Sequence, residues 1–370
     1  MDSWKSVLVR LLGALATIAL AGVAHAQPGQ DGFDWVTIGA AGNRAYDGPD
    51  PFNLVPNRGA VNYEYRMART ELTTAQALEF FNAAMARPDP LPFAGRAWWG
   101  APIIWGASVD PTYSGPGTRY RLNPSDPNAG MRAVGGLSWR QAAIICNWLQ
   151  NDKATTQAAF MNGAYDVLTF TPDVGSPTFN DQLVHNPNSR YWIPTLDEWM
   201  KAVHYDPSAD GGLGRWWEQP NGTDTPLVYG PPPSFGGDGT GMANSEFTLP
   251  GQGHYRIPLG SYPNVQTPWG LLDAAGGTTE WLESTRQVDN VLSRGLDGSF
   301  WTTNSGADFS YSWGQSAPSL RLTYTGFRIA SSIPSPSSVV VMLAGCGVLS
   351  VRKRKESGHA EESCRSFVRA

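Results

Sequence analysis

Glycine and proline interrupt this chain so often that we expect little regular secondary structure. The 370 residues contain 41 Gly and 29 Pro, while charged residues reach only 16%. Proline ends helices and glycine favours turns, so this pattern is typical of a loop-rich fold. The 15 Trp residues supply large apolar side chains that can hold such loops together. The sequence therefore predicts an aromatic core with little regular structure.

Three segments begin with the same helix-start signal, a Ser or Thr followed three residues later by Gln or Glu. In this capping box the two side chains satisfy the free amides of a helix N-terminus. The signal predicts helices from about Ala75 to Ala86 and from Trp139 to Gln150, and a shorter one from Thr195 to near Tyr205. Short extended runs are expected at Trp35–Ile38, Tyr63–Arg69, Leu259–Tyr262, Val291–Arg294 and Gly326–Ala330. The expected class is α+β.

Cysteine usage excludes several kinds of site. Cys146 is the only cysteine between residues 27 and 330, because Cys346 and Cys364 belong to the C-terminal tail. One thiol cannot form a disulfide within the domain, a zinc cluster or a redox pair. Cys146 lies on the apolar face of the expected helix 139–150, so we expect it to be buried and inert.

The N-terminal segment 1–26 has the features of a secretory signal peptide. Lys5 and Arg10 precede an apolar run from Leu11 to Val23, and Ala-His-Ala completes a cleavage site at residues 24–26. Segment 27–330 carries 28 acidic and 19 basic residues. An acidic domain does not follow a phosphate backbone, so we expect no binding to nucleic acid.

Six phrases in the sequence carry a family resemblance. They are Val61–Gln76, Gly136–Leu149, Tyr191–Trp199, Gly260–Trp281, Arg294–Phe300 and Gly326–Ala330. In order and spacing they resemble the sulfatase-modifying factor, or formylglycine-generating enzyme, family. The resemblance implies one loop-rich α+β domain with a C-type-lectin-like fold, which we place at residues 27–331.

The resemblance also implies an activity that this sequence does not support. The family oxidises a sulfatase cysteine to formylglycine, using oxygen and a copper(I) ion held by two thiolates. Both cysteines lie between the phrases that match Arg294 and Arg328, and this stretch contains no cysteine here. We therefore expect no copper and no catalytic residues. The expected function is non-catalytic binding of a peptide or glycan. The alternatives are a formylglycine-generating oxidase, a related iron- or copper-using oxidase, and a purely structural envelope protein.

A calcium site is also implied by the resemblance. It would use the side chains of Asp273 and Glu280 with the backbone carbonyls of Gly276 and Thr278. Hard oxygen ligands suit calcium, and the expected role is structural. The alternatives are a turn-capping carboxylate for Asp273 and a salt bridge to an arginine for Glu280. Gly277 stands where the family has Asn.

Two further patterns allow two interpretations each. The tryptophan pairs 98–99 and 216–217 fit either a stacking platform for a sugar or peptide, or packing within the core. Asp197 and Glu198 resemble an acid/base pair, but the position of Glu198 is better explained by helix capping.

The segment 332–355 resembles the PEP-CTERM sorting signal, and residues 356–370 form a further tail. An apolar run from Val339 to Val351 is followed by a basic cluster at 352–355. Thirteen residues are few for a permanent membrane span, so we expect transient anchoring and recognition by an exosortase-type processing enzyme. The expected location is the cell envelope, the cell surface or the extracellular space, and a simple short anchor is the alternative.

Overall fold

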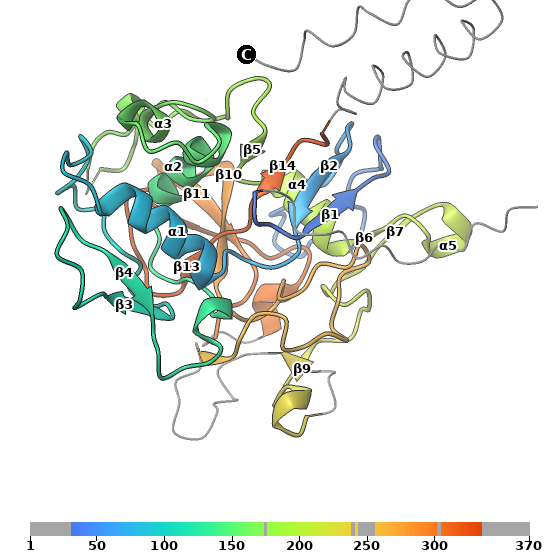
Figure 1. Cartoon of the computed structure of the whole chain (residues 1–370). Helices are drawn as coiled ribbons and strands as arrows, with labels where there is room; N and C mark the ends of the chain where they lie inside the picture. Colours follow the sequence, from blue (N-terminus) through green and yellow to red (C-terminus); the bar gives the residue numbers. More distant parts are fainter. Residues whose placement is uncertain (1–30, 174–175, 238–240, 243–255, 302–304, 335–370) are drawn as a thin grey trace, which may run out of the picture.

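The computed structural model describes residues 31–173, 176–237, 241–242, 256–301 and 305–334 (Figure 1). The expected signal peptide at 1–26, nearly all of the expected sorting segment at 332–355 and the tail at 356–370 lie outside the described residues. Within the described residues, no helix combines the length and the apolar character that a membrane span requires.

One four-stranded sheet joins the two ends of the described chain. Its strand order is β1 (Trp35–Ile38), β2 (Tyr65–Ala68), β14 (Ala330–Ser331) and β5 (Tyr191–Trp192). All neighbouring strands are antiparallel. The last strand thus lies between two earlier ones, beside β2 in Figure 1. Two of the five extended runs expected from the sequence form strands of this sheet, and a third, Gly326–Ala330, contributes only its last residue.

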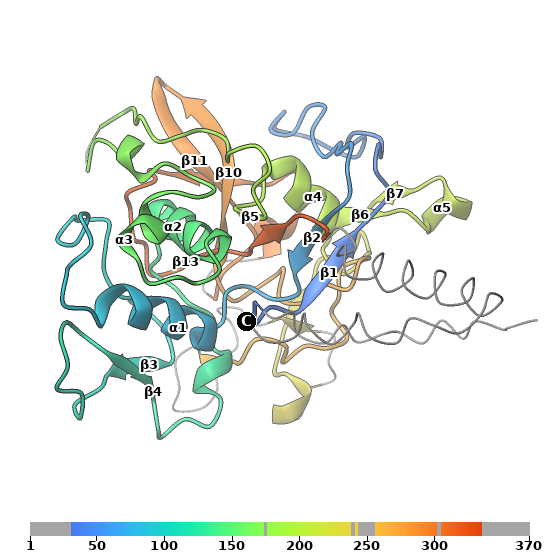
Figure 2. The same ribbon diagram turned by 45° about the horizontal axis from the view of Figure 1, so that its top comes forward.

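A second four-stranded sheet is built on a long hairpin. Its order is β12 (Gly314–Ser316), β11 (Val291–Asp297), β10 (Thr279–Val288) and β13 (Thr325–Gly326). Strands β10 and β11 are joined by a two-residue turn at Asp289 and Asn290, whose φ angles of 50° and 64° fit a tight hairpin turn. Figure 2 shows this hairpin projecting beyond the rest of the second sheet.

The three helices predicted from capping boxes are confirmed. They are α1 (Thr74–Met85), α2 (Trp139–Gln150) and α4 (Leu196–His204), and each has both hydrogen bonds of the box. The shorter elements are α3 (Gln157–Met161), α5 (Ala209–Gly212), β3 (Ala107–Val109), β4 (Tyr120–Leu122), β6 (Tyr205–Asp206), β7 (Arg215–Trp216), β8 (Val228–Tyr229), β9 (Gly241–Met242), and the 3-10 turns η1 (Ala129–Met131), η2 (Val167–Thr169), η3 (Pro233–Phe235) and η5 (Ser305–Asp308).

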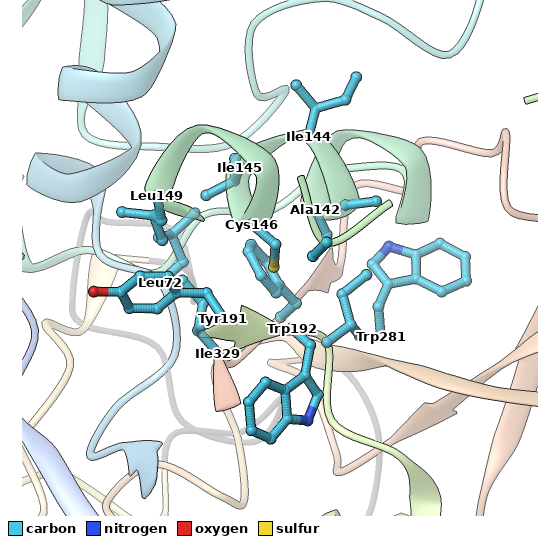
Figure 3. Close-up of a cluster of buried hydrophobic side chains, with 14 of the residues drawn as sticks. Leu72, Ala142, Ile144, Ile145, Cys146, Leu149, Tyr191, Trp192, Trp281 and Ile329 are labelled. Atoms are coloured by element: carbon cyan, nitrogen blue, oxygen red, sulfur yellow. The ribbon is translucent and has the colours of Figure 1, made fainter. Parts of the chain in front are cut away.

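The core is aromatic, as expected. Trp139 and Trp281 are fully buried, and so is Cys146, which lies in α2 and belongs to the same buried cluster as Trp192 and Trp281 (Figure 3). Burial raises the pKa of this thiol well above its usual value, so it stays protonated at neutral pH. The prediction that Cys146 is buried is confirmed.

One expected strand is absent, and one long strand was not predicted. Leu259–Tyr262 is a turn rather than a strand, because Gly260 has a φ of +79° and the Ser261 amide donates to the Pro258 carbonyl at 3.2 Å. Strand β10 was not predicted at all. Its first five residues are all buried, so they lack the alternation that marks a strand with one exposed face.

Candidate functional site

The stretch between Arg294 and Arg328 holds the core together instead of a copper ion. The Arg294 guanidinium lies 3.7 Å from the centre of the Trp139 ring and donates to the Leu183 carbonyl at 2.9 Å. Cys146, the one cysteine in the described residues, is buried and protonated. Copper(I) requires accessible thiolates, and these residues do not provide them. The site does not fit the oxidase cofactor of the family.

A buried ion pair joins the second sheet to its neighbours. The Arg328 Nη2 atom donates to Glu280 Oε1 at 2.9 Å, and the exposed fractions of the two side chains are 0% and 2%. Trp199 Nε1 donates to the other oxygen, Oε2, at 2.9 Å. Arg328 also donates to the carbonyls of Ala68, Arg69, Leu272 and Asp273. This arginine therefore connects β10 with the ends of β2 and the loop before Gly276.

Asp273 is the second carboxylate of the expected calcium site. Its Oδ2 atom accepts a hydrogen bond from the Gly260 amide at 2.6 Å, within the turn that replaces the expected strand. Burial raises the pKa of Asp273 to about 6. The side chain borders a cavity of about 10 Å³, enough for one water-sized particle.

Glu71 is a buried carboxylate that the sequence reasoning missed. It accepts hydrogen bonds from the Thr278 amide at 2.9 Å and from the Thr278 hydroxyl at 2.6 Å. A Cβ atom added to Gly277 would lie 2.4 Å from Glu71 Oε1, and Gly277 has a φ of +66°. A side chain at position 277 would therefore require the Glu71 carboxylate to move.

These contacts show how the four expected calcium ligands lie. Glu280 is bound to Arg328, and Asp273 caps a turn, as the two alternative interpretations describe. The Gly276 amide donates to the Ser299 hydroxyl. No three His, Cys, Asp or Glu side chains among the described residues are placed to hold one metal ion. In this arrangement the Glu280 oxygens accept hydrogen bonds from Arg328 and Trp199.

Two further buried carboxylates lie at the end of β11. Burial raises the pKa of Asp308 to about 7 and that of Asp297 well above its usual value, and the proximity of the Asp308 charge adds to the second shift. Asp308 Oδ1 accepts from the Ser299 amide at 2.9 Å, while its Oδ2 atom is buried without a hydrogen-bond partner in the described part of the chain. This region of the core therefore favours protonated carboxyl groups.

Three of the four paired tryptophans pack in or against the core, and the fourth, Trp217, is covered by an arginine. Trp98 is buried and Trp99 packs on Phe93, with 4.5 Å between the ring centres. Trp216 is buried, and its partner Trp217 is half-buried under the Arg215 guanidinium, 4.0 Å from the ring centre.

Glu198 caps α4, as the sequence predicted. Its Oε2 atom accepts from the Thr195 amide at 2.8 Å. Trp192 Nε1 and the Tyr63 hydroxyl donate to Oε1 at 3.0 and 2.9 Å. Every contact of this carboxylate is therefore a structural hydrogen bond, and none resembles an acid/base pair with Asp197.

A cleft of about 590 Å³ opens where the two ends of the described chain meet. This volume lies in the range of small-molecule sites. We call it the terminal cleft and define it by its polar side chains Asp31, Arg66, Asp152, Lys153, Arg190 and Tyr191. The sequence reasoning missed it, because these residues come from the N-terminal segment, β2, the turn after α2 and the start of β5.

Comparison with known proteins agrees with this description of the fold. The profile of the sulfatase-modifying factor enzyme 1-like domain matches residues 22–333. No curated protein sequence matches the chain.

Solved structures that are similar to this chain include three at low sequence identity. The crystal structure of CarF is 19% identical, with a TM-score of 0.49 over 82% of this chain and 99% of that one. Variable protein 1 of Treponema denticola is 18% identical, with a TM-score of 0.47 over 81% and 95%. PvdO from Pseudomonas aeruginosa is 13% identical, with a TM-score of 0.44 over 83% and 97%.

The expected fold class is confirmed as a single loop-rich α+β domain of the C-type-lectin-like type. Since the family profile covers most of the sequence, the chain belongs to the sulfatase-modifying factor enzyme 1-like family.

Proposed function

We propose that this protein is a non-catalytic member of its family that binds a peptide or glycan at the cell envelope. One observation carries the proposal: no cysteine occurs between Cys146 and Cys346, so the thiolate pair of the oxidase is missing from the whole domain. The remaining thiol of the domain is buried and protonated. The domain keeps the structural arginines Arg294 and Arg328 without the chemistry that accompanies them in the family.

The terminal cleft supports a binding role. It offers a concave surface of ligand size that is separate from the stretch 294–328. This cleft favours binding over a purely structural role, since a spacer or scaffold protein has no need for one.

Export and transient anchoring complete the proposal. The signal peptide at 1–26 and the sorting segment at 332–355 are the features that support it. Processing by an exosortase-type enzyme would release the domain at the surface. Cell fractionation tests this step, because deletion of residues 2–26 should leave the protein in the cytoplasm.

Structural calcium remains part of the proposal, at Asp273, Gly276, Thr278 and Glu280. For Glu280 to become a ligand, the cation would have to compete with the buried guanidinium of Arg328. Measured calcium content decides between the ion pair and the metal site.

The decisive experiment measures copper, calcium and oxygen uptake on the purified exported protein. The substrate is a sulfatase-type cysteine peptide, and an active formylglycine-generating enzyme serves as the positive control. We expect no copper and no oxygen uptake. Bound copper together with conversion of the peptide would overturn the proposal and establish the oxidase alternative.

A further inference from the structure

The terminal cleft balances its charges. Its cations are Arg66, Lys153 and Arg190, and its carboxylates are Asp31 and Asp152. A third carboxylate, Glu79 from α1, accepts from Lys153 Nζ at 2.6 Å. Three positive and three negative groups leave no net charge, so an ionic ligand gains no overall attraction and must compete with existing pairs.

The hydrogen-bond donors of the cleft are held in place. Arg66 lies 4.7 Å from the centre of the Trp35 ring, and its Nη2 atom donates to the Ser331 hydroxyl at 2.7 Å. Arg190 lies over the Tyr191 ring and donates through Nη2 to Asp152 at 2.8 Å. In the described part of the chain, the Nη1 atoms of both arginines have no hydrogen-bond partner. Two fixed donors are therefore available to a ligand.

The hydrogen-bond acceptors of the terminal cleft differ in how many protein donors they already bind. Asp31 accepts from Trp35 Nε1 at 3.1 Å and from the Tyr191 hydroxyl at 2.9 Å, so it forms part of the wall. The Asp152 side chain is 83% exposed and uses one oxygen for Arg190. Its second oxygen is an acceptor that faces solvent.

We propose that the terminal cleft binds a neutral oligosaccharide. Sugar hydroxyls donate and accept hydrogen bonds at once, which matches fixed donors beside free acceptors. A neutral ligand leaves the existing ion pairs intact, and a preorganised site loses little conformational entropy on binding. This inference rests on the proposed binding function and names the chemical class of its ligand.

The test uses the exported protein and three neutral probes: cellohexaose, maltohexaose and mannohexaose. Hexagalacturonate and a decapeptide library are the comparison probes, and affinity is measured by calorimetry at 50 and 500 mM NaCl. We expect one neutral probe to bind with an affinity that salt leaves unchanged, since net charge attraction plays no part.

A matched pair of variants locates the site. Arg190→Gln removes a donor of the cleft, whereas Arg215→Gln removes an arginine that is likewise stacked on an aromatic ring and paired with an exposed aspartate, but lies elsewhere. We expect a loss of affinity of roughly tenfold for Arg190→Gln, as for one hydrogen bond from a charged group, and no change for Arg215→Gln.

Each of the other outcomes would overturn either the inference about the cleft or the proposed function. Failure of all three neutral probes, or neutral binding that Arg190→Gln does not weaken, overturns the inference about the cleft. Salt-dependent binding of hexagalacturonate, or binding of a peptide, also overturns it but leaves the proposed binding function intact. Copper-dependent turnover of the cysteine peptide would overturn the proposed function itself.

Discussion

The protein pairs arginine with carboxylate in two very different settings. Between Arg328 and Glu280 the pair is buried, carries further bonds to backbone carbonyls, and joins three segments of the core. Between Arg190 and Asp152 the pair lies on the rim of the terminal cleft, with 44% and 83% of the side chains exposed. Breaking the buried pair should cost several kcal/mol of folding free energy, whereas breaking the exposed pair should cost about 1 kcal/mol or less. A binding site can exchange its ligand without unfolding the domain only where its ion pairs are of the exposed kind.

The largest expected effect is that of Arg328→Gln. Removing the guanidinium leaves Glu280 buried with one remaining donor, Trp199, so we expect a loss of about 3–5 kcal/mol in the free energy of unfolding. Chemical denaturation measures it. A loss below about 1 kcal/mol would mean that the two settings do not differ, and would favour a cation that replaces the arginine at Glu280.

The second-largest effect should be a dependence of the free energy of unfolding on pH, which arises in the buried region and not at the cleft. The pKa values of Asp308 and Asp273 are raised by burial to about 7 and about 6, above the unfolded value near 4. The folded state thus binds the extra protons, and the free energy of unfolding should fall as pH rises from about 4 to 7, by about 1.4 kcal/mol per unit of pKa shift.

Two variants test the source of this dependence. Asp308→Asn keeps an acceptor for the Ser299 amide but cannot titrate, so the decline with pH should become shallower. Asp152→Asn, on the exposed rim, should leave the decline unchanged. A free energy of unfolding that rises over this pH range would contradict the inference that these buried carboxyl groups are protonated in the folded state. If added calcium abolishes the decline, a metal neutralises these carboxylates instead.

A smaller effect is expected for Gly277→Asn, which restores the residue typical of the family. The new Cβ atom would lie 2.4 Å from Glu71 Oε1, so Glu71 must move from its bonds with Thr278. We expect a loss of about 1–3 kcal/mol, as for other overpacked core sites. Gly42→Asn is the control, since Gly42 has a φ of +80° and nothing within 4 Å of its added Cβ. Equal losses in the two variants would assign the effect to backbone conformation alone.

The smallest effect is that of Arg190→Gln on stability. An exposed ion pair contributes about 0–1 kcal/mol and the hydrogen bond from Arg190 to the Gln150 carbonyl about 1 kcal/mol, so the unfolding midpoint should move by only a few degrees. Differential scanning calorimetry measures this midpoint. If the variant is as stable as the parent protein, a loss of glycan affinity can be assigned to the cleft and not to unfolding. A large drop in stability would place Arg190 with Arg328 among the structural arginines.

The structural features that could be predicted from the sequence are those that depend on short-range signals. The capping boxes that begin at Thr73, Ser138 and Thr195 each span four residues, and the three helices followed from them. The ordered family phrases predicted the fold class. The arginine partner of Glu280 was foreseen only as an alternative to calcium, because sequence spacing does not show which charged groups meet in the core.

The remaining features depend on distant parts of the chain. The terminal cleft combines Asp31 with residues near position 331, and no local pattern links the two. The burial of Glu71 and Asp308 was not predicted, since an acidic residue in a polar stretch is normally exposed.

The position of β14 has a consequence for when the protein can fold. Its residues Ala330 and Ser331 pair with β2 on one side and β5 on the other, and they are among the last of the domain to be synthesised. Until they arrive, β2 and β5 have no common neighbour and the sheet remains open. Such closure by sequence-distant strands is slow, because the intervening chain must be ordered first. A nascent chain thus cannot close this sheet before residues 330 and 331 have emerged, so nearly the whole domain must be synthesised before the sheet is complete.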